Sequence, residues 1–142
     1  MRTAIVPPSW ADFYAETHIP AAVRDGQTIR ATGHTCETID HTFAADIGQQ
    51  IRDTFASIAE TLAASGASWA DVVEINSYHV GLRDQAELMT EIAGEFLADP
   101  YPAWTAVGVT ELYDVDALIE ISVVAVAPTP GRRRQAVRVV TT

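Results

Sequence analysis

Basic residues are scarce in this sequence, and their scarcity argues against two classes of partner. Nine lysines and arginines stand against 19 aspartates and glutamates, so the formal net charge is −10 at pH 7. A field of this sign repels phosphate backbones and anionic lipid headgroups. We therefore expect no nucleic-acid partner and no membrane partner.

Cysteines and long apolar runs are also scarce. The single cysteine, Cys36, cannot form an internal disulfide, and the N-terminal stretch MRTAIVPPSW lacks the apolar core of a signal peptide. The apolar run ALIEISVVAVAP is interrupted by Glu120 and stopped by Pro128, short of the roughly 20 residues that cross a bilayer. These absences predict a soluble protein of the cytoplasm.

The length and composition are typical of one globular domain. With 142 residues and 48% hydrophobic content, the chain can bury roughly two thirds of its unfolded surface in one core. We place this domain at residues 1–127. Residues 128–142, PTPGRRRQAVRVVTT, are a basic tail that we expect to be flexible, either as a solubilising end or as an anion-binding arm.

Two segments have the periodicity of amphipathic helices. The first begins at Asp46, where Gln49 completes a capping-box pattern, and ends before Gly66. The second follows Asp84 and is closed off by Pro100. Each helix has a single apolar stripe, so each needs a partner surface.

Runs of β-branched and aromatic residues predict the strands. They are VVEINSYHV at 72–80, WTAVGVTEL at 104–112 and ALIEISVVAVA at 117–127. Earlier in the chain, IPAAV and TIRATG flank residues 24–27, where an Asp-Gly pair favours a tight hairpin. The predicted order is β-β-α-β-α-β-β.

These elements predict an α+β fold in which both helices pack on one face of a single sheet. The last strand then has apolar residues on both faces, because Val124 and Val126 alternate with Ile121, Val123 and Ala125. A strand with two apolar faces and helices on one side indicates that another subunit covers the open face. We predict an oligomer.

Five segments occur in the order and spacing of a known family: TIRATGH, DIGQQIRDTFASIAETLAASG, DVVEINSYHVGLRD, YPAWTAVGV and LIEISVVAVAP. Over roughly residues 19–128 the chain resembles the RidA/YjgF family, and PYPxWTAVGVTxL is most similar to its divergent YjgH-like branch. The resemblance implies a chorismate-mutase-like fold with a mixed sheet and a homotrimer with inward-facing sheets. It also implies clefts between subunits for a small-molecule ligand, and hydrolysis of 2-imino acids to 2-oxo acids and ammonia without metal or cofactor.

The resemblance also identifies candidate site residues. The arginine that grips the substrate carboxylate in the family falls at Trp104, and an indole cannot donate a forked pair of hydrogen bonds. Other family side chains are replaced at Ile19, Met89 and Ala106. Thr32 and Glu120 keep a hydroxyl and a carboxylate. We therefore expect weak or no turnover of standard 2-imino acids.

Glu120 is unusual even without the resemblance, since a carboxylate between two isoleucines is costly to desolvate unless it is paired or protonated. It is either a general acid or base that activates water at a C=N or C=O carbon, or an exposed or arginine-paired carboxylate. Thr32 and the backbone of Gly33 are expected to make polar contacts beside it. Arg30 shares a strand face with Thr32 and is either a relocated cation for the ligand or a solvated side chain.

Trp104 has two interpretations. Its ring fills a subunit junction while its N–H finds a backbone acceptor, or it forms a wall on which a planar, uncharged ligand stacks. The ligand pocket in the second case also includes Ile19, Met89 and Ala106.

The sequence offers weaker evidence for a metal site, a cysteine nucleophile or a nucleotide-binding site. His34, Cys36 and His41 offer metal-ligand types, but their spacing fits no standard zinc site, and we expect no metal. Cys36 lacks an evident third group that would make it a nucleophile, and His79 is interpreted as a hydrogen-bonded core or interface histidine. No GxGxxG or P-loop pattern occurs, so nucleotide binding lacks support, and the resemblance implies that no cofactor is needed.

Three functional hypotheses follow. The first is a cofactor-free hydrolase or deaminase-like enzyme for a small, mostly apolar imine, enamine or carbonyl compound, with Glu120 activating water. The second is a non-catalytic trimer that binds a metabolite or regulates a partner. The third is a structural trimer whose cleft is filled by Trp104. Ribonuclease activity, which is attached to some family members, is disfavoured because no basic stripe occurs outside the tail.

Overall fold

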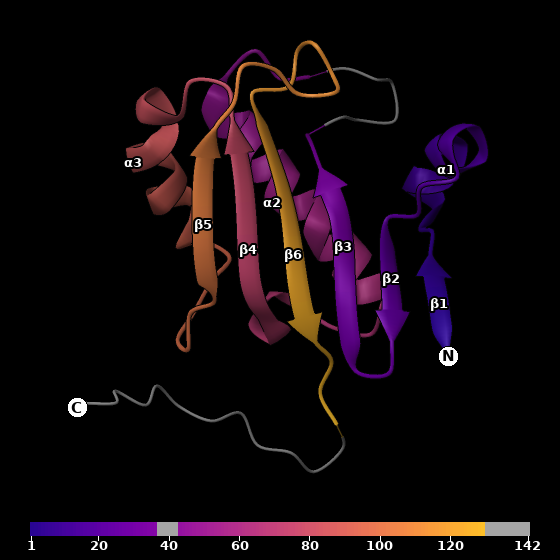
Figure 1. Ribbon diagram of the computed structural model, residues 1–142. Helices are drawn as coiled ribbons and strands as arrows, with labels where there is room; N and C mark the ends of the chain where they lie inside the picture. Colours follow the sequence, from indigo (N-terminus) through magenta and orange to yellow (C-terminus); the bar gives the residue numbers. More distant parts are fainter. Residues whose placement is uncertain (37–42, 130–142) are drawn as a thin grey trace.

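The computed structural model describes residues 1–36 and 43–129, which form a six-stranded sheet with helices (Figure 1). The strands are β1 (Arg2–Ile5), β2 (Ala22–Asp25), β3 (Thr28–His34), β4 (Val72–His79), β5 (Ala103–Gly108) and β6 (Ile119–Val126). The helices are α1 (Ala11–Thr17), α2 (Ile47–Ala64) and α3 (Leu82–Ala93), with 3₁₀ turns η1 (Pro8–Trp10) and η2 (Trp69–Asp71). The sheet order is β1-β2-β3-β6-β4-β5, and only β4 and β5 pair in parallel. The predicted α+β fold with a mixed sheet is confirmed.

The β2–β3 hairpin forms where the Asp-Gly pair predicts it. Asp25 pairs with Thr28, and Gly26 between them has a φ of 61°, a left-handed conformation that glycine adopts without a steric penalty.

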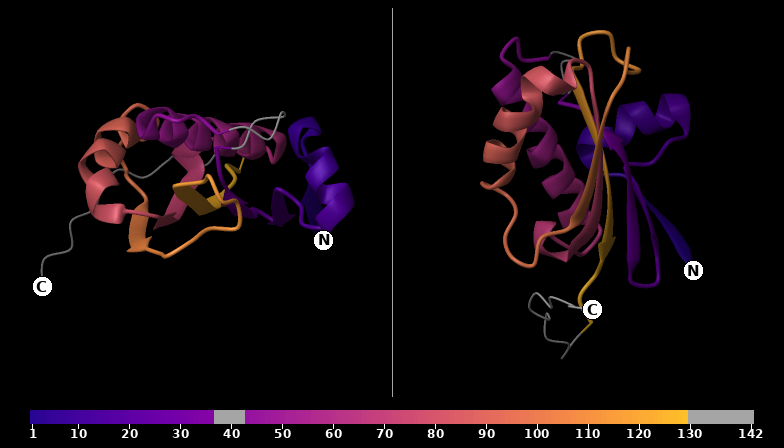
Figure 2. Two further views of the ribbon diagram at one scale, coloured as in Figure 1. Left: turned by 90° about the horizontal axis from the view of Figure 1, so that it is seen from above. Right: turned by 60° about the vertical axis from the view of Figure 1, so that its left-hand side comes forward.

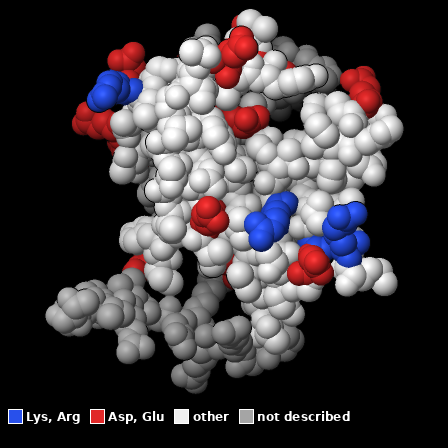
Figure 3. All heavy atoms as spheres, in the orientation of Figure 1, with Lys and Arg blue, Asp and Glu red and all other residues white. Residues whose placement is uncertain are grey.

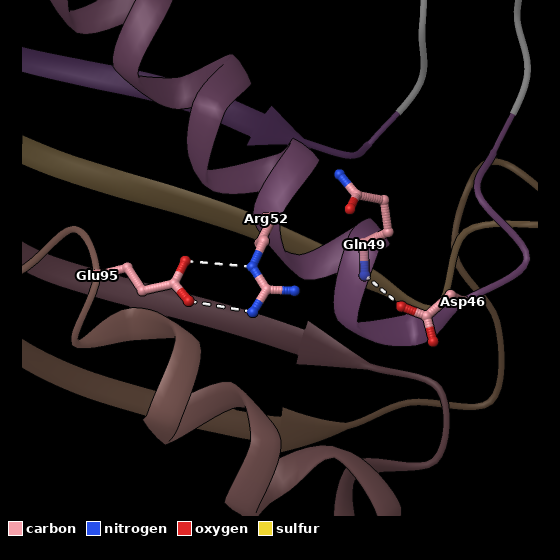
Figure 4. A network of polar contacts seen from close by, with 4 residues as sticks. All are labelled: Asp46, Gln49, Arg52 and Glu95. Atoms are coloured by element: carbon pink, nitrogen blue, oxygen red, sulfur yellow. Dashed lines mark hydrogen bonds and ion pairs between the residues drawn. The ribbon is translucent and has the colours of Figure 1, made fainter.

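At the start of α2, one of the two hydrogen bonds of the predicted capping box is present (Figure 4). The carboxylate of Asp46 accepts a hydrogen bond of 2.9 Å from the backbone N–H of Gln49. The side chain of Gln49 does not return to Asp46, because it donates to Asp53 at 2.7 Å instead. At the other end, Gly66 has a φ of +83°, as the predicted helix stop requires.

Helix α3 begins at Leu82, three residues before the predicted start after Asp84, and this difference has a backbone cause. Gly81 has a φ of 84°, which turns the chain out of β4, and its carbonyl accepts from the N–H of Asp84 at 3.2 Å. Asp84 therefore lies inside the first turn, where a carboxylate interacts favourably with the helix dipole.

The core lies between the sheet and the pair α2 and α3, which lie side by side on one sheet face (Figure 2). Its fully buried members are Ile29, Ile51, Phe55, Ile58, Leu62, Ile75, Ile92, Ile119 and Ile121. The ring of Phe96, just beyond α3, stacks on Phe55 at 5.0 Å between centroids. The prediction that both helices cover one face is confirmed.

The opposite face of β3, β6, β4 and β5 has no second layer within the described residues (Figure 2). Figure 3 views this face, and most of its atoms belong to uncharged residues. Val107 and Val126 on it are each 40% exposed. This is the apolar surface for which the sequence predicts a subunit partner.

The N-terminal segment adds elements that the sequence analysis did not predict. Strand β1 extends the sheet by pairing with β2, and η1 and α1 follow it. The indole N–H of Trp10 donates to the carbonyl of Ile19 at 2.8 Å, and its ring lies 4.6 Å from that of His34. This segment is therefore packed onto the end of β3.

The predicted tail and the predicted absence of a membrane span can be compared with the structure only over the described residues. Most of the predicted tail, residues 130–142, lies outside them, so the boundary after residue 127 stays a prediction. Among the helices that are described, none is both long and apolar enough to span a membrane.

Candidate functional site

A hollow of about 750 Å³ opens beside the end of β3. Its walls come from η1 and α1, from one side of α2, and from the loop before β6. Four of the residues that the sequence predicts for the site line it: Ile19, Thr32, Gly33 and Glu120. These residues come from segments far apart in the chain, which the sheet brings together.

Glu120 lies on the open face of β6 with its side chain packed over Gly33. A Cβ at position 33 would lie only 2.8 Å from the carboxyl carbon of Glu120. The close approach therefore requires glycine, or a displacement of the carboxyl group. The register between β3 and β6 also shifts in this region, between Ala31 and His34, which marks an irregular ladder beside the carboxylate.

Burial raises the pKa of Glu120, and the nearby carboxylate of Asp114 raises it further. Both effects disfavour the charged form of the carboxyl group. No arginine of the described residues forms an ion pair with Glu120. A carboxyl group whose pKa moves toward neutral pH can both accept and donate a proton during a reaction.

Thr32 lines the same hollow as Glu120, but the hydroxyl proton of Thr32 is already engaged in a hydrogen bond within the chain. The hydroxyl donates to the carbonyl of Pro20 at 2.7 Å, while the backbone N–H of Thr32 donates to Ala21 at 2.9 Å. The hydroxyl oxygen still has acceptor capacity. Thr32 can therefore accept a hydrogen bond from a ligand more readily than it can donate one.

Met89 and Ala106 lie elsewhere, in a separate groove of about 730 Å³. This groove runs between the first turns of α3 and strand β5, and Gly81, Leu82 and Gly108 also line it. The structure thus divides six of the eight predicted site residues between two places on one chain.

Trp104 and Arg30 line neither the hollow nor the groove. Trp104 lies on the helix side of β5, partly buried against the core and 6.3 Å from the ring of Phe55. Its indole N–H donates to the hydroxyl of Ser77 at 2.7 Å, so its acceptor is a side chain and not the backbone group that we expected. Arg30 is exposed on β3, opposite Val124 of β6.

The hydroxyl of Ser77 belongs to a buried chain of hydrogen bonds whose direction can be assigned. The amide nitrogen of Gln85 donates to the carbonyls of Val80 and Leu118, at 2.7 and 3.1 Å, so its oxygen faces Nδ1 of His79 at 2.9 Å. An amide oxygen only accepts, so Nδ1 carries the proton and Nε2 accepts from Ser77 at 2.8 Å. The prediction of a hydrogen-bonded buried histidine is confirmed, and burial lowers the pKa of His79.

His34 is also buried with both ring nitrogens engaged. Nδ1 lies 2.6 Å from the carbonyl oxygen of Thr32, and Nε2 lies 2.8 Å from the hydroxyl of Thr61. Burial lowers the pKa of His34 to about 4. Cys36 is buried nearby, and His41, the third member of the conceivable metal set, lies outside the described residues.

The sequence analysis missed the aromatic lining of the hollow. Trp10, Phe13 and Tyr113 contribute to its walls. They come from α1, from the turn before it, and from the loop before β6, and no local pattern connects these segments. Only their common position around the end of β3 identifies them.

The Endoribonuclease L-PSP family model matches residues 11–127. The RutC family protein YjgH of Escherichia coli K12 is 38% identical over 128 residues, which are 89% of this chain and 96% of that protein. The chain belongs to the RidA/YjgF family and is YjgH-like. A solved structure of the YjgH protein has a TM-score of 0.81 at 37% identity, and the match covers 90% of this chain and 98% of that chain.

Two other relatives show the breadth of this RidA/YjgF family. A 2-iminobutanoate/2-iminopropanoate deaminase of Dermatophagoides farinae is 28% identical over 107 residues, 74% of this chain and 82% of that protein. A YjgF/YER057c/UK114 family structure from Mycobacterium tuberculosis has a TM-score of 0.77 at 27% identity, covering 89% of this chain and 100% of that chain. The chorismate-mutase-like fold implied by the resemblance is thereby confirmed.

Proposed function

We propose that this chain is a cofactor-free, metal-free hydrolase of the deaminase type, which acts on a small, mostly apolar imine, enamine or related carbonyl compound in the cytoplasm. The observation that supports this most is Glu120. Its half-buried carboxyl group lines a hollow of about 750 Å³, and its pKa is raised by burial and by Asp114. The relative from Dermatophagoides farinae, a deaminase of 2-imino acids, supports the type of reaction.

Hydrolysis of an imine needs a base for the attacking water and an acid for the departing nitrogen. In the proposed reaction, water adds to the C=N carbon while Glu120 accepts one of its protons. The protonated carboxyl group returns this proton to the nitrogen, which gives a carbinolamine. The carboxylate then takes the hydroxyl proton of the carbinolamine and delivers it to the same nitrogen, so that the C–N bond breaks, the C=O bond forms and ammonia leaves. One carboxyl group can take both roles because its raised pKa lies closer to neutral pH.

The expected substrate differs from the standard 2-imino acids. The resemblance aligns the family's carboxylate-binding arginine with Trp104, whose N–H is bonded to Ser77 and whose ring packs against the core. The described lining residues of the hollow include no arginine that would replace it, and Arg30 is not among them. We therefore expect weak or absent turnover of 2-iminobutanoate and 2-iminopropanoate.

We further propose a homotrimer in which the groove of one subunit faces the hollow of the next. Such a cleft would bring Met89 and Ala106 close to Thr32 and Glu120, which one chain alone keeps apart. The uncovered apolar sheet face supports the same assembly.

The test uses imines released in situ by an oxidase, with hydrolysis measured as the loss of imine that semicarbazide can trap. For a carboxylate-free imine made from benzylamine, we expect the full chain to accelerate hydrolysis. Glu120→Gln should lower the rate by roughly 100-fold or more, the usual contribution of a general acid or base. Glu87→Gln removes one exposed carboxylate of α3 outside both sites and should leave the rate unchanged.

Fast turnover of 2-iminobutanoate would contradict the proposed substrate class. If neither class of imine is hydrolysed faster than in buffer, the alternative gains: a non-catalytic trimer that binds a small metabolite or regulates a partner.

A further inference from the structure

The hollow has a marked charge imbalance among its described lining residues. Five of them are carboxylates and none is lysine or arginine: Asp12, Asp53, Glu60, Asp114 and Glu120. In Figure 3 red atoms border the upper right of this face, where α1 approaches the loop before β6, and no blue atoms of the described residues lie there. This excess of acidic over basic side chains favours a negative potential inside the hollow.

The hydrogen-bond donors to two of these carboxylates leave the negative charge of each carboxylate in place. Glu60 accepts from the hydroxyl of Ser9 at 2.8 Å, and Asp53 accepts from the amide of Gln49 at 2.7 Å. Both donors are uncharged, so both bonds orient the carboxylates without neutralising them. Glu120 adds a half-buried carboxyl group for which a nearby cation would favour the charged form.

The aromatic walls are a second, independent feature of the hollow. Trp10 and Phe13 meet edge to face with their centroids 5.2 Å apart, and the Trp10 ring also covers His34. Tyr113 faces them from the loop before β6 and is 82% exposed, so much of its ring is available. Aromatic faces attract organic cations through the ring quadrupole, and carboxylates attract them by charge.

We infer that the hollow selects small organic cations, namely protonated amines or iminium ions with an apolar body about the size of one ring, over anions. This inference rests on the proposed site and specifies its substrate class. The reaction balances for such a substrate: R₂C=NH₂⁺ and H₂O give R₂C=O and NH₄⁺. The same negative potential opposes the carboxylate of a 2-imino acid, which adds an electrostatic reason for poor turnover of that class.

The experiment compares three ligands of similar size and different charge: benzylammonium, benzyl alcohol and benzoate. Each is titrated into the full chain at pH 7.5 by calorimetry or ligand-observed NMR, at low and high salt. Benzylammonium should bind at least about tenfold more tightly than the other two, and its affinity should fall as salt rises.

Matched variants locate the effect. Asp12→Asn neutralises an exposed lining residue of α1, and Glu120→Gln neutralises the half-buried one, so each should weaken benzylammonium binding several-fold while leaving benzyl alcohol unaffected. Glu87→Gln makes the same change in net charge outside the hollow and should leave all three affinities unchanged.

Benzoate binding as tightly as benzylammonium would overturn the inference. So would the absence of benzylammonium binding at millimolar concentration, or an equal effect of all three variants. Because binding is read without turnover, a failure here leaves hydrolysis of neutral imines standing. Conversely, charge selection without any hydrolysis would reject the proposed enzyme and keep the cation site.

Discussion

The pKa values of the half-buried Glu120 and the buried His34 move in opposite directions for one main reason. Burial disfavours the charged form, which raises the pKa of the carboxyl group and lowers that of the imidazole to about 4. The hydrogen bond between Nδ1 of His34 and the carbonyl of Thr32 opposes this lowering, but burial outweighs it. At the scale of single residues, burial decides the protonation states around β3.

These shifts predict how stability depends on pH. In the unfolded chain His34 becomes protonated below its ordinary pKa of 6.5, whereas in the folded chain it stays neutral until the pH falls to about 4, its lowered pKa. The free energy of unfolding should therefore fall as the pH drops through this window, by up to about 1.4 kcal/mol per pH unit. His79, whose pKa is also lowered, acts in the same direction.

Glu120 opposes this trend, because its pKa in the folded chain lies above its ordinary value of 4.5. Protonation of Glu120 therefore favours the folded chain, and this contribution to the free energy of unfolding increases as the pH falls toward 4.5. Urea unfolding at pH 7.0 and 5.5 should therefore show a larger loss of stability in Glu120→Gln than in the unmodified chain. Equal losses in the two proteins would contradict the assigned shift of Glu120.

At the scale of elements, the ends of the helices depend on short-range contacts. Helix α2 begins at the predicted cap, and α3 begins where Gly81 turns the chain rather than at the polar residue that resembles a cap. The bidentate contact between Arg52 of α2 and Glu95 beyond α3, at 3.1 and 3.2 Å, links the two helices on the surface (Figure 4). Both side chains of that pair are solvent-accessible, so we assign it little weight in stability.

Because only one hydrogen bond of the capping box forms, substitutions at its two residues should have unequal effects on the stability of the protein. Asp46→Ala removes the acceptor of the Gln49 N–H and should cost about 1 kcal/mol of stability, the usual effect of losing a cap. Gln49→Ala should cost much less, because the side chain of Gln49 does not return to the cap. Denaturant unfolding of both variants measures this, and equal losses would indicate a complete box in solution.

At the scale of the whole molecule, two features of the single chain support the proposed assembly. One sheet face lacks a second layer within the described residues, and six of the eight predicted site residues are divided between the hollow and the groove. Both features are explained if other copies of the chain complete the cleft and cover the face. The net charge of −10 predicts that such an assembly does not bind nucleic acids.

This predicts the mass of the particle in solution. Light scattering at micromolar concentration should give about three times the 15.3 kDa of one chain. A monomer under these conditions would contradict both the assembly and the composite cleft. RNA binding that survived removal of residues 128–142 would contradict the electrostatic argument at the same scale.

Much of the fold could be predicted because its signals are local. The stripe of α2, the Asp-Gly turn before β3 and the β-branched runs of β4 and β6 each depend on residues within a few positions of one another. Strand β1 and helix α1 were missed because they are short, with four and seven residues, and are held by contacts to β2 and His34 rather than by a pattern of their own.

The sequence by itself determined α2, α3, strands β2 to β6, the charge and the exceptional carboxylate at Glu120, since periodicity and composition act between neighbours along the chain. Only the tertiary structure decided that Trp104 faces the core, that Arg30 does not line the hollow, and that Trp10 and Tyr113 do. Those outcomes depend on which strand face and which loop meet across the sheet, and such distances are set by packing between segments far apart in sequence.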